Sequence, residues 1–172
     1  MLNHLPDRRI VLGLGNTLNR DEGLGVHALK KLEAALDLRY PAWREEKDSG
    51  LEILDGGTLG LNLLPLVEES SHLLLLDAVN AGKPAGTLVE LAKESIPLFN
   101  GIKLSDHQVT FTEVLGLASF RGKLPEYIHL IGIQPVDLAI GVDLSPEIEA
   151  LMSELVERAI AILQQWDLLP EE

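Results

Sequence analysis

Three acidic residues follow short apolar runs in the first half of the chain. Glu22 comes after Arg9–Leu12 and a glycine-rich stretch, Asp55 ends a second apolar run, and Asp77 comes directly after four consecutive leucines. If each run is a strand of a parallel sheet, the three carboxylates gather at the carboxyl edge of that sheet. In open α/β sheets this edge is where ligands bind.

His107 lies in a predicted loop that could fold over the same edge. Together with Glu22 and Asp77 it would supply nitrogen and oxygen donors, a set that suits Zn, Ni or another divalent first-row ion. Three protein ligands leave coordination positions open for water or a substrate group. Asp77 favours this interpretation most, because a buried carboxylate is costly unless it is paired.

Each of these residues also has a simpler explanation. Glu22 follows Asn19 by three residues, so it could be the return partner of a helix capping box. Asp55 precedes two glycines, so it could simply be a turn residue with no functional role. A single histidine such as His107 is more often a surface residue than a ligand. The hypothesis therefore depends on the convergence of several weak signals on one edge.

The apolar run Arg9–Leu12 predicts a strand, the stretch Gly13–Gly25 after it predicts a glycine-rich bend, and the pattern that follows predicts a helix. Together they form the first half of a βαβ unit. Glycine permits tight turns and a close approach of backbone segments. We expect the bend to expose Asn16, Asp21 and Glu22 at the end of the first strand.

A nucleotide-binding domain that uses the Gly13-Leu14-Gly15 loop is the main alternative, with Asp55 placed to bind a ribose. Leu18 stands where a dinucleotide fingerprint has its third glycine. Asp21 and Glu22 would also direct carboxylates toward a pyrophosphate, which competes with anion binding at a helix N-terminus. This alternative ranks second.

Composition excludes several other classes of protein. The 172 residues are 46% hydrophobic and 24% charged, which is typical of one globular domain. The formal net charge of −13 disfavours binding to nucleic acid and to anionic membranes. Cysteine is absent, so disulfides, thiolate metal sites and a cysteine nucleophile are excluded. Apolar runs such as Leu73–Leu76 are too short to span a bilayer, and a cytoplasmic monomer is the expectation.

Alternating strand and helix patterns predict a single α/β domain over residues 1–172. The expected architecture is a three-layer sandwich, in which a mostly parallel, twisted sheet of about five strands has helices on both faces. The expected elements, after a flexible tail at 1–8, are strands at 9–12, 51–54, 72–79, 87–91 and 127–134 and helices at 21–38, 59–69 (kinked or shortened by Pro65), 110–119 and from Ser145 onward. The strand at 87–91 is expected to return antiparallel beside Val79.

Four blocks of this sequence resemble the nickel-iron hydrogenase maturation endopeptidases. They are Gly13–Gly25 with its Asp21-Glu22 pair, Asp55-Gly56-Gly57-Thr58, Leu76-Asp77-Ala78 and His107-Gln108, and they occur in the family's order over most of the chain. The first block is the most specific. The resemblance implies a five-stranded twisted sheet between helices.

The resemblance also implies an activity. Members of that family cleave a C-terminal extension from the hydrogenase large-subunit precursor after nickel has been inserted, with the metal presented by the precursor. Carried over to this chain, Glu22, Asp77 and His107 would bind the metal, and Zn or Cd could occupy the same site in vitro. Asp55 would help to recognise nickel or the substrate. No general base is identified, and a chaperone that binds the nickel precursor without cleaving it remains a further alternative.

Overall fold

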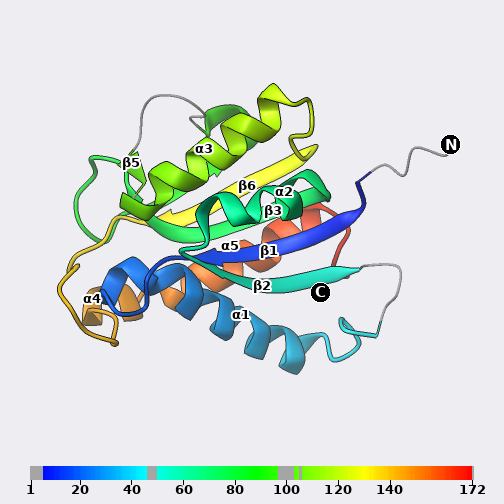
Figure 1. Cartoon of the computed structure of the whole chain (residues 1–172). Helices are drawn as coiled ribbons and strands as arrows, with labels where there is room; N and C mark the ends of the chain where they lie inside the picture. Colours follow the sequence, from blue (N-terminus) through cyan, green and yellow to red (C-terminus); the bar gives the residue numbers. More distant parts are fainter. Residues whose placement is uncertain (1–5, 46–49, 97–102, 105, 172) are drawn as a thin grey trace, which may run out of the picture.

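The computed structural model describes residues 6–45, 50–96, 103–104 and 106–171, with the backbone alone at 103–104 and 106–110. Its centre is a sheet in which five strands lie in the order β2-β1-β3-β6-β4 (Figure 1). A short sixth strand, β5, pairs with the end of β3 outside this order. The strands are β1 (Arg8–Leu14), β2 (Leu51–Gly57), β3 (Ser70–Asn80), β4 (Leu88–Ala92), β5 (Lys103–Leu104) and β6 (Tyr127–Ile133).

The pairing of the strands makes the sheet mostly parallel. β1 lies parallel to β2 and β3, and β3 lies parallel to β6. The prediction that β4 would pair with β3 was wrong, because both sides of β3 are taken by β1 and β6. β4 instead pairs antiparallel with the outer side of β6, so that Leu88 lies opposite Ile133.

Helices cover both faces of the sheet. α1 and α5 pack on one face of the sheet, and α2 and α3 pack on the other. In Figure 1, α1 lies below the strands and α3 lies above them. The helical elements are η1 (Arg20–Gly23), α1 (Leu24–Arg39), η2 (Gly60–Leu63), α2 (Leu64–Glu68), η3 (Lys93–Ser95), α3 (Asp106–Phe120), α4 (Pro146–Glu149) and α5 (Met152–Gln165). In the described part of the chain, no helix combines the length and the apolarity that a membrane span needs.

The leucines of β3 contribute side chains to two separate hydrophobic cores. Leu74 and Leu76 pack with α1 and α5, whereas Leu73 and Leu75 pack with α2 and α3. Side chains alternate between the two faces of a strand, so a continuous apolar run is what a central strand with two covered faces requires. The predicted three-layer α/β sandwich is confirmed.

Several boundaries differ from those predicted. Arg8, assigned to the tail, begins β1, where it forms ion pairs with Glu52 at 2.8 Å and Glu69 at 3.0 Å. The helix expected at 59–69 is divided into η2 and α2, and Pro65 lies in the first turn of α2, where its missing N–H costs nothing. α3 begins at Asp106, so His107 lies in a helix and not in a loop.

Candidate active site

The strand register brings the ends of β1, β2 and β3 to one edge. Gly13 lies opposite Asp55 on one side and Leu76 on the other, and Asp77 lies opposite Gly132. This carboxyl edge is the left side of Figure 1, where the segment after β1, the start of α3 and α4 are also found.

The backbone brings two further predicted residues to this edge. Glu22 belongs to η1, which directly follows the bend after β1. His107 is the second residue of α3, and β5, three residues before it, pairs with Val79 and Asn80 at the end of β3. The side chain of His107 lies outside the described residues. Among the side chains that are described, no three His, Asp or Glu groups are placed to hold a metal ion, so the predicted metal site stays a prediction.

Two glycines, which lack side chains, allow the Glu22 segment to pack closely against β3. A Cβ on Gly25 would overlap the carbonyl oxygens of Leu76 and Leu14, so the first turn of α1 contacts the residue before Asp77. Gly15 has φ of +127°, and a Cβ there would overlap the carbonyl oxygen of Glu22. Only glycine permits both the backbone angle and the contact. The glycine-rich motif therefore sets the position of Glu22 relative to Asp77.

The capping-box explanation of Glu22 finds no support in this geometry. Asn19 precedes η1 but makes no side-chain cap to it. Its own N–H, which a capping glutamate would bind, donates to the carbonyl oxygen of Asn16 at 3.1 Å. Asn19 instead donates from its side chain to the carbonyl oxygen of Leu138 at 3.3 Å.

Asp77 is fully buried, with 0% of its surface exposed. Alternation along β3 puts its side chain on the same face as Leu75 and Val79, which is the face covered by α3. Its Oδ1 accepts a hydrogen bond from the N–H of Ala78 at 2.7 Å. A carboxylate at this depth requires compensation by hydrogen bonds, a proton or a cation. Asp77 lies near the end of β3, where β5 pairs just before α3 begins, and the metal hypothesis needs it there.

Asp55 is exposed and separate from Asp77. Its Oδ1 accepts a hydrogen bond from the N–H of Gly57 at 2.8 Å, which is the turn that the simpler explanation expected. Ile53 packs into the core beneath α1, so alternation puts Asp55 on that face and Asp77 on the other. Two strand spacings also separate the two backbones, about 10 Å in all. Asp55 therefore lies on the same edge as Asp77 without joining its cluster.

Asp21 was predicted to be exposed beside Glu22, and this prediction was wrong. It is fully buried and accepts four hydrogen bonds. The donors are the N–H groups of Val136 at 3.0 Å, Asp137 at 2.8 Å and Ser145 at 2.7 Å, and the Ser145 hydroxyl at 2.8 Å. Ser145 is the residue before α4, but its side chain makes no cap to that helix and donates to Asp21 instead. Because all the donors lie more than a hundred residues away, no local pattern could have revealed this role.

The same loop, residues 134–145, is tied to η1 at further points. Arg20, which has φ of +46°, forms an ion pair with Asp137. The N–H of Arg20 donates to the carbonyl oxygen of Gly141 at 3.0 Å, and the N–H of Gly141 donates to that of Leu18 at 2.9 Å. The Ala139 N–H and the Arg20 guanidinium hold the pKa of Asp137 below its ordinary value. The carboxyl edge is therefore bordered by a well-anchored loop.

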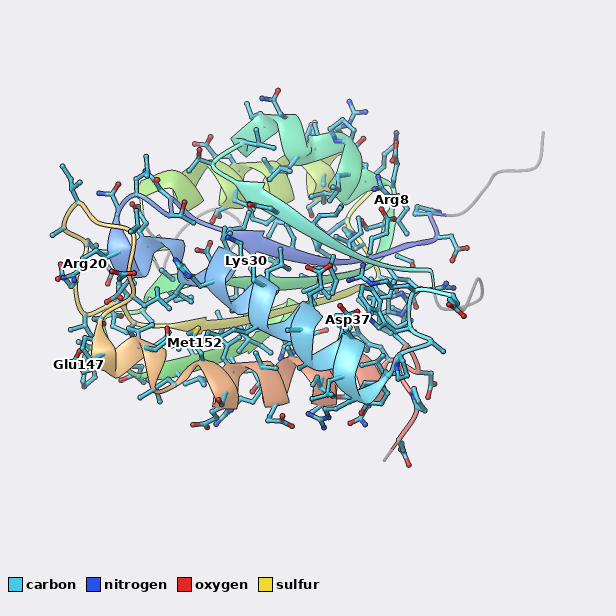
Figure 2. The ribbon with its side chains drawn as sticks, turned by 90° about the horizontal axis from the view of Figure 1, so that it is seen from below. Arg8, Arg20, Lys30, Asp37, Glu147 and Met152 are labelled. Carbon is cyan, nitrogen blue, oxygen red and sulfur yellow. The ribbon has the colours of Figure 1, made fainter. Side chains whose placement is uncertain are left out.

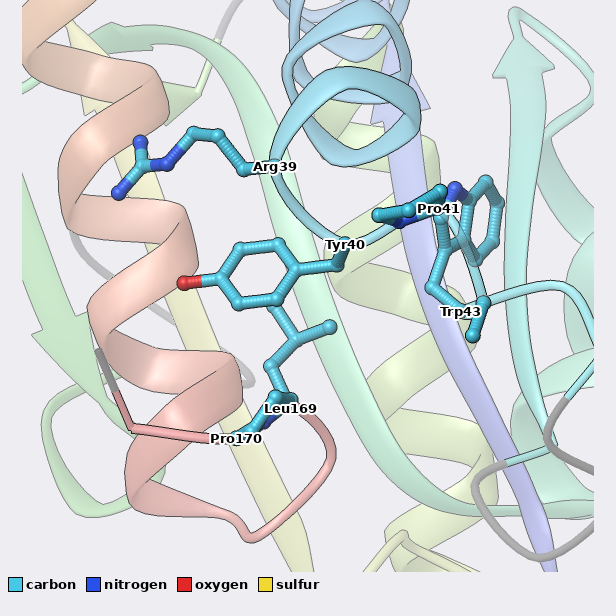
Figure 3. A pocket seen from close by; sticks show the side chains of 7 residues that line it. Arg39, Tyr40, Pro41, Trp43, Leu169 and Pro170 are labelled. Atoms are coloured by element: carbon cyan, nitrogen blue, oxygen red, sulfur yellow. The ribbon is translucent and has the colours of Figure 1, made fainter.

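A cavity of about 170 Å³ lies elsewhere, at the far end of α1 (Figure 3). Tyr40, Trp43 and Leu169 line it, and the hydroxyl of Tyr40 accepts a hydrogen bond from Gln164 at 3.1 Å. α1 spans 16 residues, or about 24 Å at 1.5 Å per residue, between this cavity and Glu22. The cavity is not part of the candidate site.

An open, mostly parallel sheet with helices on both faces defines a three-layer α/β protein, a class whose members bind ligands at the carboxyl edge of the sheet. Comparison with known proteins identifies the group within this class. The sequence profile described as hydrogenase maturation protease matches residues 26–162.

Relatives and solved structures agree with the profile. The chain is 38% identical over 161 residues to a hydrogenase expression/formation protein HupD of Rhizobium leguminosarum bv. viciae, covering 92% of this chain and 75% of the relative. It is 35% identical over 159 residues to the hydrogenase 2 maturation protease of Escherichia coli, covering 92% of each. The structure of the hydrogenase maturating endopeptidase HybD from E. coli superposes with a TM-score of 0.76 at 33% identity, covering 92% of this chain and 93% of that one.

The chain belongs to the hydrogenase maturation protease family. The family membership selects the endopeptidase interpretation over the nucleotide-binding alternative. It also gives the Gly13–Gly25 motif a purpose other than phosphate binding, namely the placement of an acidic segment against β3.

Proposed function

We propose that this chain is an endopeptidase that removes the C-terminal extension of a hydrogenase large-subunit precursor, and that it acts on the precursor after nickel insertion. The family supplies the class of reaction and of substrate. The observation that carries the assignment to this edge is the packing of Gly25 on Leu76. This contact puts the Glu22 segment next to the fully buried Asp77, on the edge where α3 begins.

In this proposal the nickel ion is part of the substrate. Glu22, Asp77 and His107 complete its coordination with nitrogen and oxygen donors, which suit nickel and also Zn or Cd in vitro. A metal held this way supplies Lewis-acid polarisation of a carbonyl or a more acidic bound water. The residues of the chain hold the precursor so that the scissile bond lies at the sheet edge. Asp55, exposed on β2 two strands away from Asp77, contacts the substrate from the other face.

Water is the proposed attacking group. The chain contains no cysteine and no Gly-x-Ser-x-Gly motif, so neither a thiolate nor a serine in that setting is available. We also propose that the protein works as a monomer in the cytoplasm. Sedimentation of the purified chain alone checks the monomer.

The test is incubation of the purified chain with nickel-loaded and nickel-free precursor, followed by mass spectrometry. The expected result is release of one C-terminal fragment from the nickel-loaded precursor alone. Binding without release would identify a chaperone instead. Cleavage of both precursors at equal rates would show that processing does not depend on nickel and would contradict that part of the proposal.

Substitutions then test the three proposed ligands. Glu22→Gln, Asp77→Asn and His107→Ala should each lower the rate of processing by at least about 10–100-fold, because each removes a metal ligand. Thermal unfolding should stay near that of the wild type. Glu157→Gln is the matched control, since Glu157 lies on α5 and pairs with Arg39 at 2.6 Å. Retention of processing by all three ligand variants would contradict the proposed site.

A further inference from the structure

Exposed apolar side chains gather at the carboxyl edge. Eleven large apolar residues among those described are exposed, and seven of these lie on the segments that follow β1, β2 and β6. These seven are Leu18, Leu59, Leu61, Val136, Leu138, Ile140 and Val142. The strand register places all three segments at the edge that carries Asp77. The segments after β1 and β6 are also joined by backbone hydrogen bonds at Gly141. Clustered apolar exposure of this kind marks an interaction surface.

The loop after β6 presents these side chains on a fixed backbone. Ile140 is 91% exposed, and Val142 is 62% exposed. Gly141, which lies between them, is joined to Leu18 and Arg20 by backbone hydrogen bonds. The buried carboxylate of Asp21 accepts hydrogen bonds from the N–H groups of Asp137 and Ser145 in the same loop. The polar anchors are buried while the apolar side chains face solvent. A surface ordered in advance loses little conformational entropy on binding.

The charge around this surface is mostly negative, although the exposed Lys83 lies beside Gln134, where its backbone N–H donates to Oε1 at 3.4 Å. Residues 134–150 contain four acidic residues and no lysine or arginine, and Asp143 and Glu147 are exposed. Residues 51–82 likewise contain no lysine or arginine. The one arginine on the segment after β1, Arg20, is paired with Asp137. Figure 2 shows Arg20 and Glu147 at one end of the molecule and Arg8 at the other.

We propose that Leu18, Val136, Leu138, Ile140 and Val142, which we name the edge patch, dock an apolar and cationic segment of the precursor. The inference rests on the proposed function, because the edge patch is continuous with the edge that carries Glu22 and Asp77. Apolar contact supplies the affinity, and Asp143 and Glu147 select a positively charged partner. The edge patch thus holds the precursor while the site at the end of β3 engages its metal.

The first test is Ile140→Glu, alone and together with Leu138→Glu. Both side chains are exposed, so folding should be unaffected, which circular dichroism and thermal unfolding check. Binding of the nickel-loaded precursor, measured by surface plasmon resonance, should weaken about 10–100-fold, as expected from losing the burial of one or two aliphatic side chains. In processing assays KM should rise by the same factor, and kcat at saturating precursor should stay unchanged.

Two control residues have an exposure similar to the 91% of Ile140 and lie away from this edge. Leu38 is 83% exposed at the end of α1, and Phe120 is 87% exposed at the end of α3. Leu38→Glu and Phe120→Glu should leave precursor binding and KM at wild-type values. A loss of binding equal to that of Ile140→Glu would show that any added charge is harmful and would overturn the assignment to the edge patch.

Charge is tested separately. Asp143→Lys should weaken precursor binding, and about 1 M salt should reduce the difference between this variant and the wild type, because charges are then screened beyond about 3 Å. If Asp143→Lys binds more tightly, the docked segment is acidic and the proposed partner chemistry is wrong.

The outcomes separate this inference from the proposed function. If the wild-type chain binds the precursor without cutting it, and Ile140→Glu abolishes that binding, the edge patch is supported and the proposed endopeptidase activity is contradicted. A chain that cuts normally with Ile140→Glu and Leu138→Glu together overturns the edge patch and keeps the endopeptidase. A wild-type chain that sediments as a dimer, converted to monomer by Ile140→Glu, assigns the edge patch to a second copy and also overturns the proposal.

Discussion

At the scale of single residues, two neighbouring acids have opposite roles. Glu22 is partly exposed at the carboxyl edge, while Asp21 is fully buried and holds the loop after β6. Both lie in one short 3-10 turn. A sequence pattern that contains both acids therefore combines a candidate ligand with a structural anchor.

Asp21→Asn should destabilise the protein by about 2–4 kcal/mol, because an amide nitrogen in place of one carboxylate oxygen cannot accept the bonds from buried N–H groups. Urea unfolding measures the loss. Processing should fall as well, since the loop supports the edge patch.

The matched control is Asp143→Asn, the same change at an exposed position near the end of the same loop. Its stability should stay within about 0.5 kcal/mol of the wild type. Equal stability of the two variants would mean that the buried hydrogen bonds of Asp21 contribute nothing net.

At this scale the sequence predicts a residue's place where its position after a strand is enough to determine it. Asp77 was predicted at the edge from its place after four leucines, and its burial agrees with that reasoning. Asp55 was placed on the correct edge, but the face it takes depends on register, which only the paired strands reveal. Asp21 could not be assigned, because its partners are remote in the chain.

At the scale of elements, the close contact between α1 and β3 is what brings the acidic segment to the edge. Sequence reasoning predicted a strand, a bend and a helix here, but not η1 as a separate turn. It also put His107 in a loop, because the apolar pattern that predicts α3 begins only at about Thr110. The predicted pairing of β4 with β3 was wrong for a related reason. Proximity to β3 in the sequence does not reveal which edge of the sheet is free to accept another strand.

Gly25→Ala tests this contact. In a helix this change normally stabilises by about 0.5–1 kcal/mol. Here the added Cβ would overlap two carbonyl oxygens that cannot rotate away, so we expect a loss of about 3 kcal/mol in urea unfolding. Processing should fall further than stability explains, because Glu22 would move relative to Asp77.

Gly122→Ala provides the comparison. Gly122 has open space around its Cβ position but a φ of +69°, so its cost of about 1–2 kcal/mol comes from the backbone angle alone. Processing by this variant should be normal at a temperature where it is folded. Full processing by Gly25→Ala would show that the contact with Leu76 does not position the site.

At the scale of the whole molecule, the two ends of the sheet differ in kind. The amino end is closed by ion pairs of Arg8 and by a cluster in which His72 stacks on Tyr127 at 4.4 Å and meets Trp166 edge-on at 5.4 Å. The carboxyl end carries acidic residues together with exposed apolar side chains, which are the proposed contacts to a partner. Stability can therefore be altered at one end without touching the proposed site at the other.

His72 makes this separation testable through pH. Burial, with a smaller contribution from Arg9, lowers its pKa below the ordinary value of 6.5. As pH falls below about 6.5, the unfolded chain binds a proton that the folded chain excludes, so stability is lost on going from about pH 7.5 to 5.5. One histidine can contribute a slope of at most about 1.4 kcal/mol per pH unit. The carboxylates with lowered pKa values change only near pH 4 and below, outside this window.

His72→Phe should keep the stacked ring and remove the titration. Urea unfolding at about pH 7.5 and 5.5 should then show a smaller loss of stability than in the wild type. The part that remains should come largely from His27, whose pKa burial also lowers, so adding His27→Gln should flatten the profile further. Processing at pH 7.5 should be normal in His72→Phe, because His72 lies at the amino end of β3. An unchanged pH dependence would show that His72 takes up its proton equally well in the folded protein.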